Sequence, residues 1–299
     1  MGKSSRDWTQ IYEIYGMDEW QTLTFLLLHA IVFFLLSVLL LIYFSPICSF
    51  FDSLTLFSSL PPRSARFAAG FIVSVPALFA SCLFFVAGNF FYSSIPLRWE
   101  MSQRMVKVVN DWSNVKTALD VGCGRGILLN AIAKQLKKEG SSGRVVGLDQ
   151  KKTVTTSTLR TAGIEGVQEY VTCREGDVRQ LPFGDNYFDV VVSAVFLHTV
   201  GKEFGRRTAA AAAERVRVLG EVVRVLKPGG VGVVWDLVHV PEYVRRLQEL
   251  RMEEITVSER VTAFMMSSHI VSFRKPIQQP VAPGEVSLDC KSAHYVNIC

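Results

Sequence analysis

Charged residues are scarce in this sequence: Asp, Glu, Lys and Arg make up 20% of its 299 residues, whereas 49% are hydrophobic. This balance excludes an intrinsically disordered chain, which carries much charge and few apolar residues. The formal net charge is only +5, and the basic residues form no cluster interleaved with aromatic ones. We therefore expect no nucleic-acid partner.

Metal-binding patterns are also absent from the sequence. The six cysteines contain no CxxC pair, and none has a zinc-like spacing from one of the five histidines. We expect no metal site. The cysteines are interpreted as reduced thiols of a protein that faces the cytosol.

Hydrophobic residues are concentrated near the N-terminal end. The stretch Leu23–Phe44 has 22 residues without Asp, Glu, Lys or Arg, and a helix of this length spans the roughly 30 Å hydrocarbon core of a bilayer. A second uncharged stretch covers residues 67–92 and contains Pro76 and Gly88, which transmembrane helices tolerate. The sequence predicts two transmembrane helices and a connecting loop in residues 23–92.

The first stretch fits a cleavable signal peptide poorly, because residues 1–22 mix acidic and basic side chains and a second apolar stretch follows. One span with a second segment lying on the membrane remains an alternative. Basic residues near the helix ends favour a hairpin with both ends in the cytosol. Those outside the hairpin are Lys3, Arg6, Arg98, Arg104 and Lys107, and those in its connection are Arg63 and Arg66.

This topology predicts an integral membrane protein. Residues 1–22 then form an N-terminal cytosolic segment, and the chain after the hairpin also faces the cytosol. The sequence contains no recognisable organelle address, so the endoplasmic reticulum is the default expectation.

The pattern changes from residue 97 onward, where short apolar runs alternate with amphipathic stretches. This alternation is typical of an α/β domain with a parallel sheet. We expect the domain to cover residues 97–275 and a loose tail to cover 276–299. The predicted elements are helix 101–112, strand Thr117–Val121, helix Ile127–Lys138, strands Arg144–Leu148 and Asp189–Ser193, helix Thr208–Leu226, and strands Val231–Trp235 and Met265–Phe273.

Three alternate glycines, Gly122, Gly124 and Gly126, follow the first predicted strand. Glycine lets the backbone approach a ligand closely, and the N–H groups of the next helix point towards an anionic group. This loop predicts a nucleotide-like cofactor. A nicotinamide-dependent oxidoreductase is a weaker alternative, because Ile127 stands where a GxGxxG motif needs its last glycine and the sequence has no Tyr-x-x-x-Lys pair.

Two acidic residues follow the glycines at strand ends. Asp149 ends the second strand, where a carboxylate can accept hydrogen bonds from ribose hydroxyls. Asp177 follows the expected third strand and can accept from an adenine amino group. Each residue alone is more typical of a cap or a surface position, but their order and spacing favour cofactor contact.

Five segments in this order resemble the class I S-adenosylmethionine-dependent methyltransferases, especially the branch with ubiquinone, menaquinone and sterol methyltransferases. The domain also resembles plant membrane-anchored members of this superfamily. The resemblance covers residues 97–275 and leaves out the apolar stretches and the tail. The matching segments are 119–126, 146–149, 175–183, 186–191 and 225–230.

The resemblance implies a Rossmann-like sheet of seven strands, mostly parallel with the last strand antiparallel. It also implies S-adenosylmethionine as the cofactor. By position, the three glycines of the loop pass its methionine portion, and Asp120 helps to position its amino group. Asp149 holds the ribose, and Asp177 reads the adenine together with the backbone of Val178.

A general base is needed only when the methyl acceptor arrives protonated. His198, just past the end of a predicted strand, is the best-placed candidate, and a structural role is its alternative. The sequence lacks the Asn/Asp-Pro-Pro-Tyr motif of amine methylation on nucleic acids. Asp236 alone is insufficient for metal-dependent catechol methylation.

These features predict a membrane-anchored enzyme that transfers a methyl group to a small acceptor. A lipophilic acceptor fits this prediction, because two spans would hold the pocket near the bilayer, although anchoring can equally serve localisation alone. The alternative is a membrane scaffold that has kept the methyltransferase fold and lost turnover.

Overall fold

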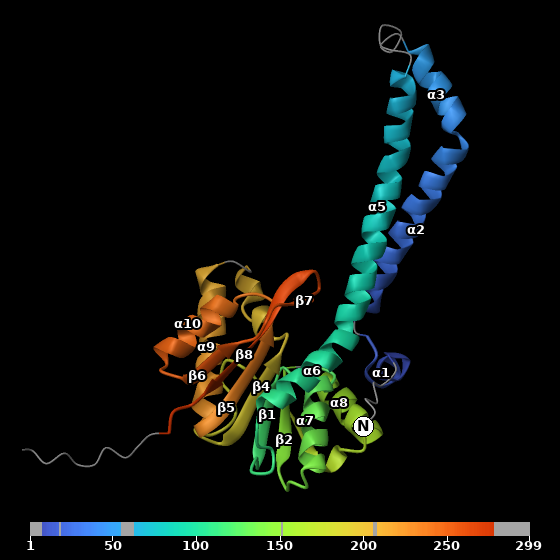
Figure 1. Cartoon of the computed structure of the whole chain (residues 1–299). Coiled ribbons are helices and arrows are strands. Elements are labelled where there is room, and N and C mark those ends of the chain that lie inside the picture. Colours follow the sequence, from blue (N-terminus) through green and yellow to red (C-terminus); the bar gives the residue numbers. More distant parts are fainter. Residues whose placement is uncertain (1–7, 18, 55–62, 151, 206–207, 278–299) are drawn as a thin grey trace, which may run out of the picture.

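A computed structural model describes residues 8–17, 19–54, 63–150, 152–205 and 208–277 of the chain (Figure 1). An α/β domain is built on one sheet with strand order β3-β2-β1-β4-β5-β8-β6, and a further strand, β7, pairs with β8. The strands are β1 (Thr117–Val121), β2 (Arg144–Asp149), β3 (Val171–Glu175), β4 (Phe188–Ala194), β5 (Leu226–Asp236), β6 (Glu253–Val257), β7 (Val261–Ala263) and β8 (Met266–Arg274).

Strands β1 to β5 pair in parallel, whereas β8 is antiparallel to both β5 and β6. The predicted mostly parallel sheet with an antiparallel last strand is therefore confirmed, and the short β7 is an addition to it. The parallel neighbours follow from apolar runs that are buried on both faces, such as Ala118, Leu119 and Val121, whose exposed fraction is 0%.

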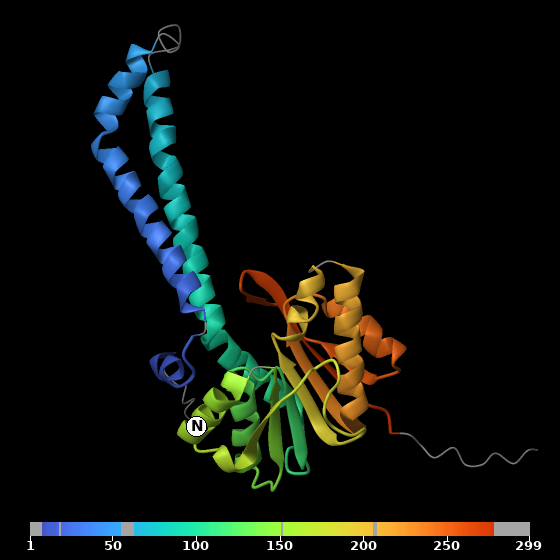
Figure 2. The ribbon, with the colours of Figure 1, turned by 180° about the vertical axis from the view of Figure 1, so that it is seen from behind.

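Helices cover both faces of the sheet and divide the core in two. Helices α6 (Pro96–Val108), α7 (Ile127–Lys138) and α8 (Lys152–Ile164) pack on one face, around Met101, Met105 and Trp235. Figure 2 shows α9 (Ala209–Val225) and α10 (Val240–Glu249) on the other face, where Tyr243 is fully buried. Short 3₁₀ turns lie at Gln168–Tyr170, Leu197–Thr199 and Lys202–Phe204.

The N-terminal part forms a helical hairpin that projects from the domain (Figure 1). The hairpin contains α2 (Trp20–Ile42), α3 (Phe44–Ser53) and α5 (Ser64–Ser94), and α1 (Trp8–Tyr15) precedes it. The rings of Phe33 in α2 and Phe79 in α5 lie 5.5 Å apart. Helices α2 and α5 are long and apolar enough to cross a membrane, by length and composition. Helix α5 runs into α6 with only Ile95 between them.

Residues 44–53 and 226–230 differ from the sequence prediction, and the helix predicted over 101–112 is observed as α6, which begins at Pro96 and ends at Val108. Residues 44–53 form helix α3 where a loop is expected, because Pro46 lies in the first helical turn, where its missing N–H has no intrahelical acceptor. Strand β5 begins at Leu226, five residues earlier than predicted. Lys227 pairs with Asp189 of the neighbouring strand at 2.6 Å, which keeps this segment beside β4.

Candidate functional site

The predicted site residues meet at one edge of the sheet. Because β1 to β5 are parallel, their carboxyl ends lie on the same edge, which is where open α/β sheets bind ligands. Gly122 follows β1, Asp149 ends β2, Asp177 lies two residues after β3, and His198 lies four residues after β4. The structure thus brings together residues that are up to 76 positions apart in the sequence.

The glycine loop has the backbone geometry that its sequence predicts. Gly122 and Gly124 have φ angles of +74° and +49°, in the left-handed region that favours glycine. A Cβ atom on Gly122 would lie 2.1 Å from the ring of Phe196, whereas one on Gly124 would meet no atom of the described residues within 4 Å. The loop therefore packs against Phe196 on one side and leaves open space for a ligand at Gly124.

Asp149 is tied directly to this loop. Its carboxylate oxygen Oδ2 accepts a hydrogen bond from the backbone N–H of Gly124 at 3.2 Å. Thr158 donates to the carbonyl oxygen of Gly124 at 2.6 Å, so the loop is fixed from two sides. This places a half-buried carboxylate beside the open face of the loop, as a ribose-binding residue requires.

Asp120 is a buried carboxyl group, and one of its oxygen atoms lacks a hydrogen-bond donor among the described residues. Its side chain is 1% exposed, and its Oδ2 atom has no hydrogen-bond partner among the described residues. Burial and the nearby carboxylate of Asp149 raise the pKa of Asp120 to about 8. An ammonium group would supply both a donor and a compensating charge, so the site fits the amino group of S-adenosylmethionine.

Asp177 and Val178 form a tight turn after β3. Oδ1 of Asp177 accepts a hydrogen bond from the backbone N–H of Arg179 at 2.9 Å, while its side chain remains exposed. The side chain of Val178 is fully buried in the core. The turn is thus anchored by Val178 and presents Asp177 at the carboxyl edge, and the predicted adenine contact stays a prediction.

His198 belongs to a hydrogen-bonded dyad with Asp236, the last residue of β5. The ring atom Nδ1 of His198 lies 2.5 Å from Oδ1 of Asp236, and the backbone N–H of His198 donates to Oδ2 at 2.8 Å. The hydroxyl of Tyr243 and the N–H of Leu237 also donate to this carboxylate, at 2.9 and 2.8 Å.

These bonds orient the imidazole. An ionised carboxylate only accepts hydrogen bonds, so Nδ1 of His198 carries the hydrogen and Nε2 is the basic nitrogen. Asp236 is 1% exposed and has four donors, whereas the side chain of His198 is 17% exposed. Burial and the neighbouring Asp236 raise the pKa of Tyr243, which keeps this hydroxyl a donor.

Helix α1 packs beside the glycine loop, which the sequence did not predict. The carbonyl oxygen of Tyr15 accepts from the guanidinium of Arg125 at 2.6 Å, and the hydroxyl of Tyr15 donates to Glu165 at 2.8 Å. Ile11 and Tyr15 are each 1% exposed and pack near Ile95. The segment before the hairpin is therefore attached to the domain next to the glycine loop.

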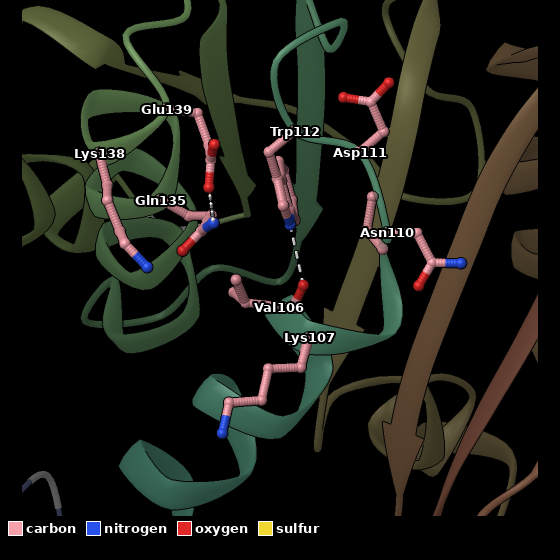
Figure 3. A pocket seen from close by; sticks show the side chains of 9 residues that line it. Val106, Lys107, Asn110, Asp111, Trp112, Gln135, Lys138 and Glu139 are labelled. Carbon is pink, nitrogen blue, oxygen red and sulfur yellow. Dashed lines mark hydrogen bonds between the residues drawn. The ribbon is translucent and has the colours of Figure 1, made fainter. Parts of the chain in front are cut away.

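A cavity of about 240 Å³ lies away from this edge, at the C-terminal end of α7 (Figure 3). There, Trp112 donates from Nε1 to the carbonyl oxygen of Val106 at 2.9 Å, and Gln135 donates to Glu139 at 2.8 Å. The glycine loop lies at the opposite end of the same helix. No group of three His, Cys, Asp or Glu side chains able to hold a metal ion occurs within the described residues.

Comparison with known proteins assigns the central part of the chain. Residues 119–234 match the family described as "Methyltransferase domain". These residues form a methyltransferase domain, and S-adenosylmethionine is the cofactor that the resemblance implies.

Two curated relatives of this methyltransferase domain are quinone methyltransferases by name. One is the demethylmenaquinone methyltransferase of Lactobacillus johnsonii, 39% identical over 119 residues, or 39% of this chain and 42% of the relative. The other is the chloroplastic 2-phytyl-1,4-beta-naphthoquinone methyltransferase of Arabidopsis thaliana, 32% identical over 123 residues, or 40% and 41%. The chain thus matches less than half the length of either relative.

The chain is also similar to solved structures, of which one is a methyltransferase by its title. The N-methyltransferase NodS from Bradyrhizobium japonicum, in complex with S-adenosyl-L-homocysteine, is 17% identical. The match covers 59% of this chain and 86% of that chain, with a TM-score of 0.45.

Proposed function

We propose that the protein transfers a methyl group from S-adenosylmethionine to a small lipophilic acceptor of the quinone type at a membrane surface. One observation carries this proposal: the long apolar helix α5 continues almost directly into α6, and α6 packs on the methyltransferase domain. An acceptor dissolved in the bilayer would be concentrated beside the domain. The names of both curated relatives support a quinone-type acceptor.

The cofactor residues divide into three groups by their geometry. The open glycine loop would receive the methionine portion, and Asp120 would pair with its amino group. Asp149 would accept hydrogen bonds from the ribose, and the exposed Asp177 would contact the adenine. The full set is Asp120, Gly122, Gly124, Gly126, Asp149, Asp177 and Val178.

His198 is the proposed general base. Bound S-adenosylmethionine supplies a methyl group that is already activated by its sulfonium. An acceptor of the quinol type carries a hydroxyl proton, and removal of this proton makes the acceptor a better nucleophile. Nε2 of His198 would accept that proton, because Asp236 holds the ring with its hydrogen on Nδ1. Asp236 and Tyr243 are positioning residues, since they act through His198.

The membrane arrangement is part of the same proposal. Helices α2 and α5 cross the bilayer as a hairpin, and residues 1–22 and the methyltransferase domain face the cytosol. The endoplasmic reticulum is the proposed membrane. The chloroplast is the alternative raised by the name of the Arabidopsis relative.

Methyl transfer in native membranes tests this function. Membranes that contain the full-length protein receive methyl-labelled S-adenosylmethionine, and the label is measured in organic and aqueous phases after extraction. Asp149→Ala removes the proposed ribose contact. Asp111→Ala is the matched control, because Asp111 is an exposed carboxylate in the loop between α6 and β1, at the opposite edge of the sheet.

We expect label in the organic phase with the wild type and with Asp111→Ala, and background label with Asp149→Ala. Label confined to the aqueous phase would reject the lipophilic acceptor and keep the enzyme. Asp149-independent or absent label in both phases, with cofactor binding intact, would favour the catalytically silent scaffold.

A further inference from the structure

The turn between β7 and β8 has an unusual backbone. Phe264 and Met265 connect the paired residues Ala263 and Met266 and have φ angles of +49° and +60°. Two-residue hairpin turns with two left-handed residues strongly favour Asn and Gly, because a side chain at such a position is strained. Two large apolar residues here must therefore be held by other contacts.

These contacts come from the end of helix α5. The backbone N–H of Met265 donates to Oδ1 of Asn89, and that of Phe264 donates to Oγ of Ser93, both at 2.9 Å. The ring of Phe264 lies 5.8 Å from that of Phe90. The turn is thus fixed to the base of the helical hairpin, as Figure 1 shows for β7 and α5.

The turn nevertheless leaves apolar side chains in the open. Met265 is 50% exposed and Met266 is 43% exposed, side by side at the tip. The contacts with α5 involve the backbone of the turn and the ring of Phe264. They do not bury the two methionine side chains, so these side chains gain no stabilising contact with α5 in water. Adjacent exposed apolar residues of this kind typically mark a contact with a protein or a membrane.

The position of the turn favours the membrane. Helices α2 and α5 run antiparallel and are in contact at Phe33 and Phe79. Trp20 lies thirteen residues before Phe33, and Tyr92 lies thirteen residues after Phe79, so Trp20 and Tyr92 lie at the same level of the hairpin. The ring of Trp8 lies 5.5 Å from that of Tyr92. Trp and Tyr gather where a transmembrane helix meets the bilayer surface. Asn89 and Ser93, which hold the turn, lie within one helical turn of this aromatic level.

We propose that the tip formed by Phe264, Met265 and Met266 is a third membrane contact, with Met265 and Met266 inserted into the interfacial region of the bilayer. This inference rests on the proposed crossing of the membrane by α2 and α5. Strand β8 leads from the tip to His269, which lies opposite Asp236 of the dyad in the register of β5 and β8. A bilayer contact at the tip therefore sets the tilt of the domain and directs the carboxyl edge of the sheet towards the lipid.

Site-directed fluorescence in vesicles tests the contact. Met265→Cys and Met266→Cys, each in the full-length protein, are labelled with an environment-sensitive fluorophore in phosphatidylcholine vesicles. Labelling of the unsubstituted protein gives the background of the native cysteines. Ile277→Cys is the matched control, because Ile277 is 71% exposed and follows β8 at the opposite edge of the sheet. Quenching by spin-labelled lipid is compared with quenching by aqueous iodide.

We expect at least threefold stronger lipid quenching at positions 265 and 266 than at 277, with the reverse order for iodide. Equal iodide quenching at the three positions would overturn the inference. Alkaline carbonate extraction of the same vesicles separates the two proposals. Protein that stays in the vesicles with a water-exposed tip loses only the third contact, whereas protein that is released loses the membrane hairpin and the tip contact together.

Discussion

The helical hairpin and the methyltransferase domain are both rich in apolar residues, but the hairpin exposes these side chains and the domain buries them. In the most apolar 18 residues of α2, only 11% are buried, and in the corresponding window of α5, 22%. In the domain, the core strands hide such residues completely, as with Leu119 at 0% exposure against 59% for Leu35 of α2. The domain supplies its own apolar environment, whereas the hairpin requires one from outside.

The polar groups of the two regions differ in the same sense. Away from the base of the hairpin, polar side chains of α2 and α5 bond within their own helix: Nδ1 of His29 contacts the carbonyl oxygen of Phe25 at 2.8 Å, and Ser81 donates to that of Ala77 at 2.9 Å. In the domain they bond between elements, as His198 does with Asp236. Hydrogen bonds within one helix suit a lipid environment, because lipid tails offer polar groups no hydrogen-bond partner.

Arginine substitutions at exposed apolar positions should give the largest difference between the two regions. Leu35→Arg combined with Leu39→Arg adds two charges to exposed positions of α2. Each exchange costs about 3 to 4 kcal/mol in a bilayer, so we expect the protein to leave the membrane fraction on alkaline extraction. Ile164→Arg, at a 55% exposed position of α8, should leave extraction unchanged and alter stability by about 0.5 kcal/mol or less. Equal behaviour of the two variants would contradict the contrast.

The dyad provides the next effect in size. His198→Ala should slow methyl transfer to a protonated acceptor by roughly 10²- to 10⁴-fold, because the base is lost. Asp236→Asn should slow it less and shift the pH profile, since it alters the orientation of His198 without removing it. Cofactor affinity, measured by calorimetry, should stay within about twofold of wild type in both variants. Unchanged rates with His198→Ala would assign His198 a structural role.

Asp120 gives an effect of another kind, on the pH dependence of stability. Its pKa is about 8 in the folded protein, against 3.8 for a free aspartate carboxyl group, so the folded state binds the proton more tightly. Stability in the cofactor-free protein should therefore fall as pH rises from 4 towards 8, by at most about 1.4 kcal/mol per pH unit. Asp120→Asn should remove this slope in denaturant titrations at several pH values. An unchanged slope would show that other groups cause it.

Local signals in the sequence were sufficient for much of the fold. The bounds of β1 and α7 agree with the prediction to the residue, because alternation, a glycine turn and an amphipathic period define them. Beyond these elements, the resemblance supplied the mostly parallel sheet and its antiparallel last strand, whereas the strand order comes from the structure. The start of β5 was missed because the pair of Lys227 with Asp189 depends on a neighbouring strand.

The candidate site was predictable only where a motif names it. The glycine loop and Asp149 carry such a motif, and the structure joins them by a hydrogen bond. The pairing of His198 with Asp236, 38 residues apart, has no local signature. The docking of Tyr15 on Arg125, 110 residues away, likewise follows from tertiary packing alone.

The most direct test is a comparison of two acceptors with the same headgroup. The full-length protein in vesicles receives labelled S-adenosylmethionine and a demethylated naphthoquinol, either with or without a long isoprenoid tail. A membrane-held domain should methylate the tailed compound with a kcat/KM at least tenfold higher, because the bilayer concentrates it beside the carboxyl edge. Equal values, or a preference for the tail-free compound, would contradict the placement of the site at the membrane.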